Sequence, residues 1–88
     1  MRVIWSPAAL TEIERIYSYI ADFDPTAARA LTDALLAHGD GLVNFPYRGR
    51  PVGDNLREIM PVYPYLIRYE ITGDIVQILR VRHGMRRQ

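Results

Sequence analysis

Two helix starts of the same kind, Ser6-Pro7 and Asp24-Pro25, constrain the fold of this chain more than any other feature. Ser and Asp are favoured helix N-caps, and Pro is tolerated at the first helical position because its missing N–H would have no partner there. Each pair is followed by apolar residues at spacings of three and four, which predicts an amphipathic helix. The first helix is expected to run to about Phe23. The second then begins almost at once, so the two should form an antiparallel helical hairpin.

The end of the second helix is less sharply defined by the sequence. Gly39 and Gly41 each cost about 1 kcal/mol relative to Ala in a helix interior. We therefore expect the helix either to end near Ala37 or to continue to about Asn44 because tertiary packing overrides those costs. Pro46 ends it in either case, since Pro cannot continue the hydrogen-bond ladder.

Strands are expected on both sides of the hairpin. The strand-like segments are rich in β-branched or aromatic residues and comprise residues 2–5, 55–60, 63–72 and 75–82. Residues 47–54 contain Gly and Pro and are expected to form a loop. The resulting order, β-α-α-β-β-β, predicts an α+β fold in which the helical hairpin packs on a mainly antiparallel sheet. With 88 residues, 49% of them hydrophobic and 24% charged, the chain suits a single globular domain spanning residues 1–88.

The last two strands are joined by Gly73-Asp74, which is typical of a two-residue hairpin turn. If these two residues are the whole loop, Thr72 pairs with Ile75 and the register continues from that pair.

In that register Arg80 lies opposite Ile67, and Arg82 lies opposite Tyr65. Because side chains alternate along a strand, Arg80 and Arg82 would share one face with the core residue Val76. We therefore expect Arg80 at the rim of the core, with its guanidinium in a groove.

The basic residues are unevenly distributed. The net charge is only +1, but all 11 basic residues are Arg. After Asp74 the chain has no acidic residue, and five basic ones follow: Arg80, Arg82, His83, Arg86 and Arg87. Arg makes planar, bidentate contacts to carboxylate or phosphate, so the end of the chain favours an acidic or phosphate-bearing partner.

Other features of the composition exclude whole classes of function. The chain has no Cys, which excludes disulfides and thiolate metal sites, and we expect no cofactor and no metal. The apolar runs are too short to span a bilayer, and the start of the chain lacks the apolar region of a signal peptide. We expect a cytoplasmic protein without a membrane partner.

Four stretches, in this order, carry a resemblance to a known family: "WSPAALTEIERIYSYIA", "DPTAARAL" with "LVNFPYRGRPV", "LREI" with "YLIRYEI", and "VQILRVRHGMRR". Together they resemble the RelE/ParE superfamily of bacterial toxins from type II toxin–antitoxin pairs. The final stretch is similar to the Ile/Val-x-Arg-Val-x-His-Gly run common in the ParE branch.

The resemblance implies the toxin of a plasmid-stabilisation, ParDE-like module. Such a toxin would arrest growth by inhibiting DNA gyrase. It would be neutralised by a cognate ParD-like antitoxin in a hetero-oligomer, for which we expect a heterotetramer of two toxins and two antitoxins. On this interpretation the candidate residues that contact antitoxin or target are Arg80, Arg82, Arg86, Tyr63 and Tyr65.

The alternative implied by the resemblance is a RelE-like, ribosome-dependent mRNA endoribonuclease. Metal-independent RNA cleavage uses the 2′-OH as nucleophile and needs a base, an acid and cations at the phosphate. By position in the family, Arg57 and Arg80 would bind the phosphate and His83 would be the acid or base. The chain lacks Lys and has no Tyr after His83, both of which nuclease members use. A non-enzymatic toxin is therefore the preferred interpretation, with direct nucleic-acid binding left open.

The same residues also admit structural interpretations. Arg57 and Arg80 would then hydrogen-bond to Glu70, Glu58 or helix-end carbonyls, and His83 would only terminate a strand. Glu58 is expected on the opposite strand face from Arg57, which argues against Glu58 as a catalytic base. A third class, an antitoxin-bound scaffold without toxicity, also fits the sequence.

Overall fold

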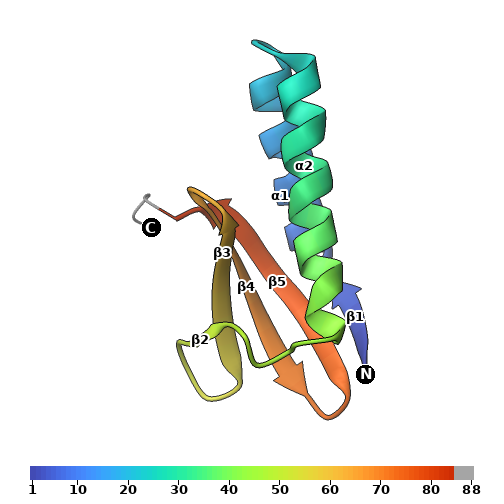
Figure 1. Ribbon diagram of the computed structural model, residues 1–88, viewed down its shortest axis with the longest axis vertical. Helices are drawn as coiled ribbons and strands as arrows, with labels where there is room; N and C mark the ends of the chain where they lie inside the picture. Colours follow the sequence, from blue (N-terminus) through green and yellow to red (C-terminus); the bar gives the residue numbers. More distant parts are fainter. Residues whose placement is uncertain (85–88) are drawn as a thin grey trace.

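The computed structural model describes residues 1–84 of the chain. The elements are, in order, β1 (Arg2–Trp5), α1 (Pro7–Ala21), α2 (Pro25–Asp40), the 3₁₀ helix η1 (Gly41–Val43), β2 (Arg50–Pro51), β3 (Leu56–Val62), β4 (Tyr65–Thr72) and β5 (Ile75–His83). The sheet has five strands in the order β1-β5-β4-β3-β2. β1 is parallel to β5 and the other neighbours are antiparallel. Figure 1 shows the two helices side by side, extending well beyond one end of the sheet. The predicted α+β architecture is confirmed.

Both predicted helix caps are present. The Ser6 hydroxyl accepts a hydrogen bond from the Ala9 N–H at 3.0 Å, and the Asp24 carboxylate accepts one from the Ala27 N–H at 3.0 Å. Each cap satisfies a backbone donor that the first turn of a helix leaves free. No helix within residues 1–84 combines the length and apolar character needed to cross a membrane.

α2 continues through Gly39 and ends at Asp40, beyond the shorter predicted end near Ala37, and the 3₁₀ helix η1 then covers Gly41–Val43, short of the predicted end at about Asn44. The backbone of Gly39 lies against Trp5, and a Cβ at this position would overlap the indole ring and lie 2.9 Å from Cδ1 of Ile78. The Trp5 indole N–H also donates to the Asp40 carboxylate at 2.8 Å. Packing against β1 and β5 therefore carries the helix through a residue of low helix propensity.

The segment predicted as a loop contains a short edge strand, β2. Arg50 pairs with Glu58, and Pro51 pairs with Arg57 on β3. Pro has no N–H to contribute to a ladder, so it is confined to edges and ends of strands, and β2 lies at the edge of the sheet.

The core lies between the helical hairpin and one face of the sheet. Its buried members come from both α-helices, from η1 and from β3, β4 and β5: Ala9, Ile13, Leu35, Leu42, Ile59, Ile67, Tyr69, Ile71, Val76, Ile78 and Val81. The predicted alternation along β4 is confirmed, because Ile67, Tyr69 and Ile71 are buried and Tyr65 packs against this cluster.

The β4–β5 register begins as predicted and then departs from the prediction. Thr72 pairs with Ile75 across the turn, where Gly73 has φ +59, and Tyr69 pairs with Ile78. The next pair is Arg68 with Arg80, so β5 holds one extra residue, a β-bulge at Leu79.

The bulge overturns the predicted positions of the two strand arginines. Arg80 lies opposite Arg68 instead of Ile67, and Arg82 lies opposite Leu66 instead of Tyr65. Val81, not Arg80, continues the buried face, with 1% of its surface exposed. The prediction failed because it assumed strict alternation along β5, whereas one unpaired residue reverses the face of every later side chain.

Candidate functional site

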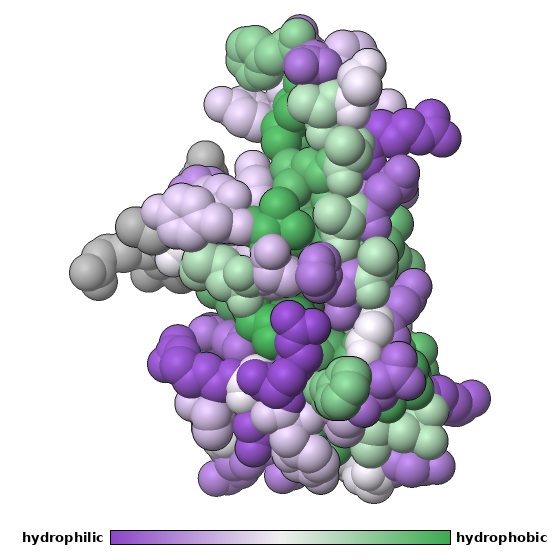
Figure 2. Space-filling view, viewed as in Figure 1, coloured by the Kyte–Doolittle hydropathy of each residue, from purple (hydrophilic) through white to green (hydrophobic). Residues whose placement is uncertain are grey.

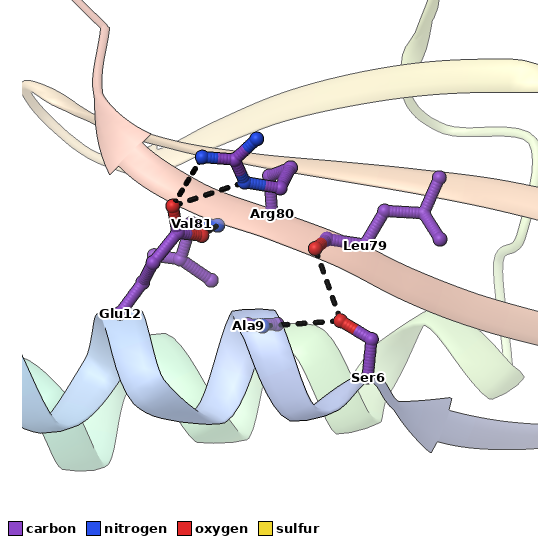
Figure 3. A network of polar contacts seen from close by, with 6 residues as sticks. All are labelled: Ser6, Ala9, Glu12, Leu79, Arg80 and Val81. Atoms are coloured by element: carbon purple, nitrogen blue, oxygen red, sulfur yellow. Dashed lines mark hydrogen bonds and ion pairs between the residues drawn. The ribbon is translucent and has the colours of Figure 1, made fainter.

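The bulge places Arg80 beside a carboxylate of α1. Glu12 accepts hydrogen bonds from Arg80 Nε at 3.0 Å and from Arg80 Nη2 at 2.7 Å through its Oε2 atom. Its other oxygen, Oε1, accepts the backbone N–H of Val81 at 2.7 Å (Figure 3). One carboxylate therefore joins the middle of α1 to a side chain and to the main chain of β5.

The same edge of β5 is held by the start of α1. β1 ends at Trp5, opposite Ile78, so β5 continues beyond its only neighbour on that side. The Ser6 backbone N–H donates to the Ile78 carbonyl at 2.9 Å, and the Ser6 hydroxyl donates to the Leu79 carbonyl at 3.0 Å (Figure 3). Ser6 and Glu12 thus satisfy polar groups that an open strand edge would otherwise expose.

The Glu12 contact stabilises the charged form of Arg80. Hydrogen bonding to the Glu12 carboxylate, followed by its Coulombic attraction, raises the pKa of Arg80 above its ordinary value, while burial opposes the shift. Arg is protonated in proteins in any case, and the contact directs its Nε and Nη2 donors at α1. Its side chain remains 43% exposed, against 15% for Glu12.

A groove of ≈ 500 Å³ opens next to this contact, between α1 and the end of β5. We call it the α1–β5 groove, and its lining residues are Glu12, Arg15, Ile16, Tyr19, Tyr65, Val81, Arg82 and His83. The Tyr65 and His83 rings meet edge to face at 5.6 Å. Figure 2 shows hydrophobic surface along the helical hairpin with hydrophilic side chains beside it, so apolar and charged groups adjoin on this molecule.

Arg82 gives the groove a specific chemical character. Its Nε atom is buried and has no hydrogen-bond acceptor among residues 1–84. A buried donor left without an acceptor costs roughly 1–3 kcal/mol. Because Arg15 also lines the groove and Glu12 is bound to Arg80, the groove is suited to a carboxylate with apolar groups on either side.

Arg57 lies in a different part of the molecule. Its Nη1 atom donates to the carbonyls of Tyr47 at 3.0 Å and Gly49 at 2.7 Å, and its guanidinium carbon lies 5.1 Å from the centroid of the Tyr47 ring. Glu58 contacts different residues, Arg68 at 2.8 Å and 2.5 Å and Arg50 at 3.1 Å. The contacts agree with the predicted placement of Arg57 and Glu58 on opposite faces.

The three residues expected to act together in RNA cleavage do not share one pocket. Arg57 pairs with Tyr69 and His83 pairs with Tyr65, so the two are separated by four residues along β4, about 13 Å. Arg80 is bound to Glu12, and only His83 of the three lines the α1–β5 groove. Their catalytic roles stay predictions.

The residues expected to contact an antitoxin or target are likewise dispersed. Tyr65 and Arg82 line the groove, whereas Tyr63 is 72% exposed in the turn between β3 and β4. Arg80 lies beside the groove in its contact with Glu12. Arg86 lies outside the described residues.

The sequence analysis missed the contribution of α1 to this site. Glu12, Ile16 and Tyr19 are spaced by four and three residues, which places them on one helix face toward β5. That spacing is visible in the sequence, but nothing in it indicates which strand the face meets. Within residues 1–84 no cluster of three His, Asp or Glu side chains is positioned to hold a metal ion.

Comparison with known proteins agrees with this fold. The family model described as the ParE toxin of the type II toxin–antitoxin system parDE matches residues 3–88. Two toxins of Caulobacter vibrioides are similar over nearly their whole length. RelE2 is 39% identical, covering 97% of both chains, and RelE1 is 36% identical, covering 94% of this chain and 92% of its own. A solved structure titled as the chromosomal ParDE TA system from P. aeruginosa has the same fold, with a TM-score of 0.82 and 23% identity over 94% of this chain and 95% of that one.

The helical hairpin on a five-stranded mixed sheet is therefore the fold of a toxin of this class. The chain belongs to the ParE toxin family of type II toxin–antitoxin systems.

Proposed function

We propose that this toxin arrests growth by binding a protein target, DNA gyrase, and not by cleaving RNA. The observation that supports this proposal is the use of Arg57 and Arg80 within the fold. Nη1 of Arg57 is bound to two loop carbonyls, and Nε and Nη2 of Arg80 are bound to Glu12, so both guanidiniums are already oriented by contacts within the fold. Gyrase is the target that the family resemblance implies.

A cognate antitoxin would neutralise the toxin at the α1–β5 groove. The groove offers apolar surface from Ile16, Tyr19 and Tyr65 and a buried Arg82 donor that finds no acceptor within residues 1–84. An amphipathic segment with an acidic residue between apolar ones would bury that surface and satisfy Arg82, which is the usual way a helical or extended segment binds a groove.

The toxin–antitoxin complex is proposed to be a heterotetramer of two toxins and two antitoxins. Light scattering on the co-purified complex measures its mass directly. A mass of one toxin with one antitoxin would contradict this stoichiometry without affecting the proposed mode of growth arrest.

The function is tested by inducing the chain alone in a bacterial host and mapping RNA 5′ ends within minutes of induction. We expect growth to stop while translated messages stay intact. In parallel, the purified toxin should inhibit gyrase supercoiling of a relaxed plasmid, and prior mixing with the antitoxin should abolish the inhibition. Intact supercoiling at a toxin concentration well above that of gyrase would contradict gyrase as the target.

RelE-like mRNA cleavage is the second candidate function. Arg82 and His83 line one groove, and both Caulobacter relatives carry the RelE name. New 5′ ends phased to codons would favour this activity over gyrase binding. Arg82→Ala and His83→Ala, each checked for folding by circular dichroism, should then abolish the new ends.

A further inference from the structure

The segment between η1 and β2, residues 44–49, is held in place by hydrogen bonds to Tyr69 and Arg57 and by a turn of its own. We call it the aromatic loop, because Phe45 and Tyr47 belong to it. Figure 1 shows it passing from the end of α2 across the sheet to β2. No residue of the loop lines the α1–β5 groove.

A single buried tyrosine of β4 anchors the loop backbone. Tyr69 is fully buried, and its hydroxyl donates to the Pro46 carbonyl at 2.7 Å while accepting the Gly49 N–H at 2.9 Å. Gly49 allows this approach, since a Cβ there would lie 2.5 Å from the Tyr69 hydroxyl oxygen. The loop backbone is therefore tied to the core of the sheet at two points.

Arg57 anchors two further carbonyls of the loop. It donates to the carbonyls of Tyr47 and Gly49, and the Arg48 N–H closes a turn onto the Phe45 carbonyl at 3.2 Å. Every residue from 45 to 49 thus has at least one main-chain hydrogen bond. The backbone entropy that a loop normally loses on binding a partner has already been lost on folding.

This fixed loop presents its largest apolar side chains to solvent. Phe45 is 70% exposed and Tyr47 is 64% exposed, although both belong to the residue types that dominate binding energy at interfaces. One face of the Tyr47 ring lies against the guanidinium of Arg57, a residue of β3. The hydrogen bonds hold the loop backbone, and the two aromatic rings that it carries remain in solvent.

The charge around the rings is positive. Arg48 is exposed, and the Arg50 side chain is 74% exposed at the start of β2. Glu58, which contacts Arg50, also binds Arg68, so two arginines share one carboxylate. The surface would therefore complement an apolar pocket bordered by acidic side chains.

From these observations we propose that the aromatic loop is the surface by which the toxin binds its protein target. Protruding aromatic rings on a rigid loop fit a pocket of a folded partner, whereas an antitoxin segment fits the α1–β5 groove. The loop is anchored at Tyr69 and the groove begins at Tyr65, about 13 Å apart along β4. The identity of the target as gyrase rests on the proposed function above.

The test compares the double variant Phe45→Ala/Tyr47→Ala with the wild type in the gyrase supercoiling assay and in antitoxin binding. Both side chains are exposed, so the fold should survive, which circular dichroism and thermal unfolding check. We expect the toxin concentration for half-inhibition to rise roughly tenfold or more, the loss typical of hot-spot aromatics, with antitoxin affinity unchanged. Phe23→Ala, at a residue that is 78% exposed outside the loop, is the matched control and should leave half-inhibition unchanged.

Tyr69→Phe tests the role of rigidity. It retains both exposed rings but removes the hydroxyl that ties Pro46 and Gly49. We expect inhibition to weaken less than in the double variant, because both exposed rings remain and only the two bonds of the hydroxyl are lost. Inhibition equal to wild type in both Tyr69→Phe and the double variant would overturn the proposal.

Two further outcomes separate this proposal from its alternatives. Loss of antitoxin binding with inhibition retained would assign the loop to the antitoxin and overturn it as a target surface. Binding of fluorescein-labelled oligothymidylate that disappears in the double variant would overturn it in favour of a nucleic-acid platform. If the wild-type toxin does not inhibit gyrase, the proposed function is wrong, and growth arrest on induction replaces gyrase inhibition as the measurement. Growth arrest by a folded double variant would then overturn the loop proposal. Loss of growth arrest in the double variant would support the loop proposal.

Discussion

The indole ring of Trp5 packs against Gly39 so closely that a single methyl group on Gly39 would overlap the ring. This contact joins β1 to the end of α2, and the indole N–H adds a hydrogen bond to Asp40 one residue later. Glycine suits this helical position because Trp5 of β1 occupies the space that any larger side chain would need.

Gly39→Ala should destabilise the fold although Ala is the better helix former. The propensity gain is about 1 kcal/mol, but overpacking against Trp5 and Ile78 costs about 1–3 kcal/mol, so we expect a net loss in urea unfolding. Gly41→Ala is the matched control, because a Cβ there meets nothing within 4 Å and φ is -67. It should be neutral or stabilise by up to about 1 kcal/mol. Equal effects of the two substitutions would show that the Trp5 contact is unimportant.

Glu12→Ala should lower the free energy of unfolding by roughly 2 kcal/mol, because the Val81 N–H loses a charged acceptor and Arg80 loses its partner. Glu12→Gln keeps an acceptor for Val81 and should cost about half as much.

A double-mutant cycle of Glu12→Gln with Arg80→Met isolates the ion pair. We expect a coupling of at most about 1 kcal/mol, since the Arg80 side chain is 43% exposed. Identical losses for the Ala and Gln variants would contradict the role of the Val81 hydrogen bond.

The two helices, the order of the elements and the start of the β4–β5 register could be predicted because short-range signals determine them. Caps at Ser6 and Asp24 and a two-residue turn at Gly73-Asp74 act over a few residues. The bulge at Leu79 is flanked by contacts with Ser6 and Glu12, which lie more than sixty residues earlier in the chain. No local pattern reports such a contact, so the faces of Arg80 and Arg82 were predicted wrongly.

Tyr69 should make the protein sensitive to alkali. Burial raises the pKa of the Tyr69 phenol, while the Gly49 hydrogen bond and the charges of Arg57 and Arg48 oppose the shift. The folded state therefore holds this proton to a higher pH than the unfolded chain does. The contribution of this proton to the free energy of unfolding is fully present below about pH 10, the pKa of the Tyr69 phenol in the unfolded chain. It is lost as the pH rises above that value toward the higher pKa of the folded state.

Urea unfolding between about pH 8 and about pH 11 measures this loss. Wild-type stability should fall more steeply at the alkaline end than that of Tyr69→Phe. The variant should start lower at neutral pH by roughly 1–3 kcal/mol, because the Pro46 carbonyl and the Gly49 N–H lose their partner. Parallel curves for the two proteins would exclude Tyr69 as the cause of alkaline destabilisation.

The candidate site was only partly accessible from the sequence. The basic end of β5 and Tyr65 were recognised, and the groove contains Tyr65, Arg82 and His83. The part supplied by α1 was not, since a helix face acquires its function from the strand that it meets. The resemblance could not reveal that Arg57 and Arg80 are used in intramolecular contacts, because a matched position does not report a side chain's partners.

Arg82→Met separates binding from stability in the α1–β5 groove. Met has an unbranched apolar side chain that can fill the same space, and it removes the buried Nε donor that has no acceptor among residues 1–84. Stability should therefore be unchanged or rise by roughly 1 kcal/mol, whereas antitoxin affinity should fall because the acidic segment loses its partner. Arg80→Met is the matched control and should reduce stability, since Glu12 would keep a partly buried carboxylate without its cation. A marked loss of stability in Arg82→Met would mean that the guanidinium supports the fold, and unchanged antitoxin affinity would remove Arg82 from the proposed interface.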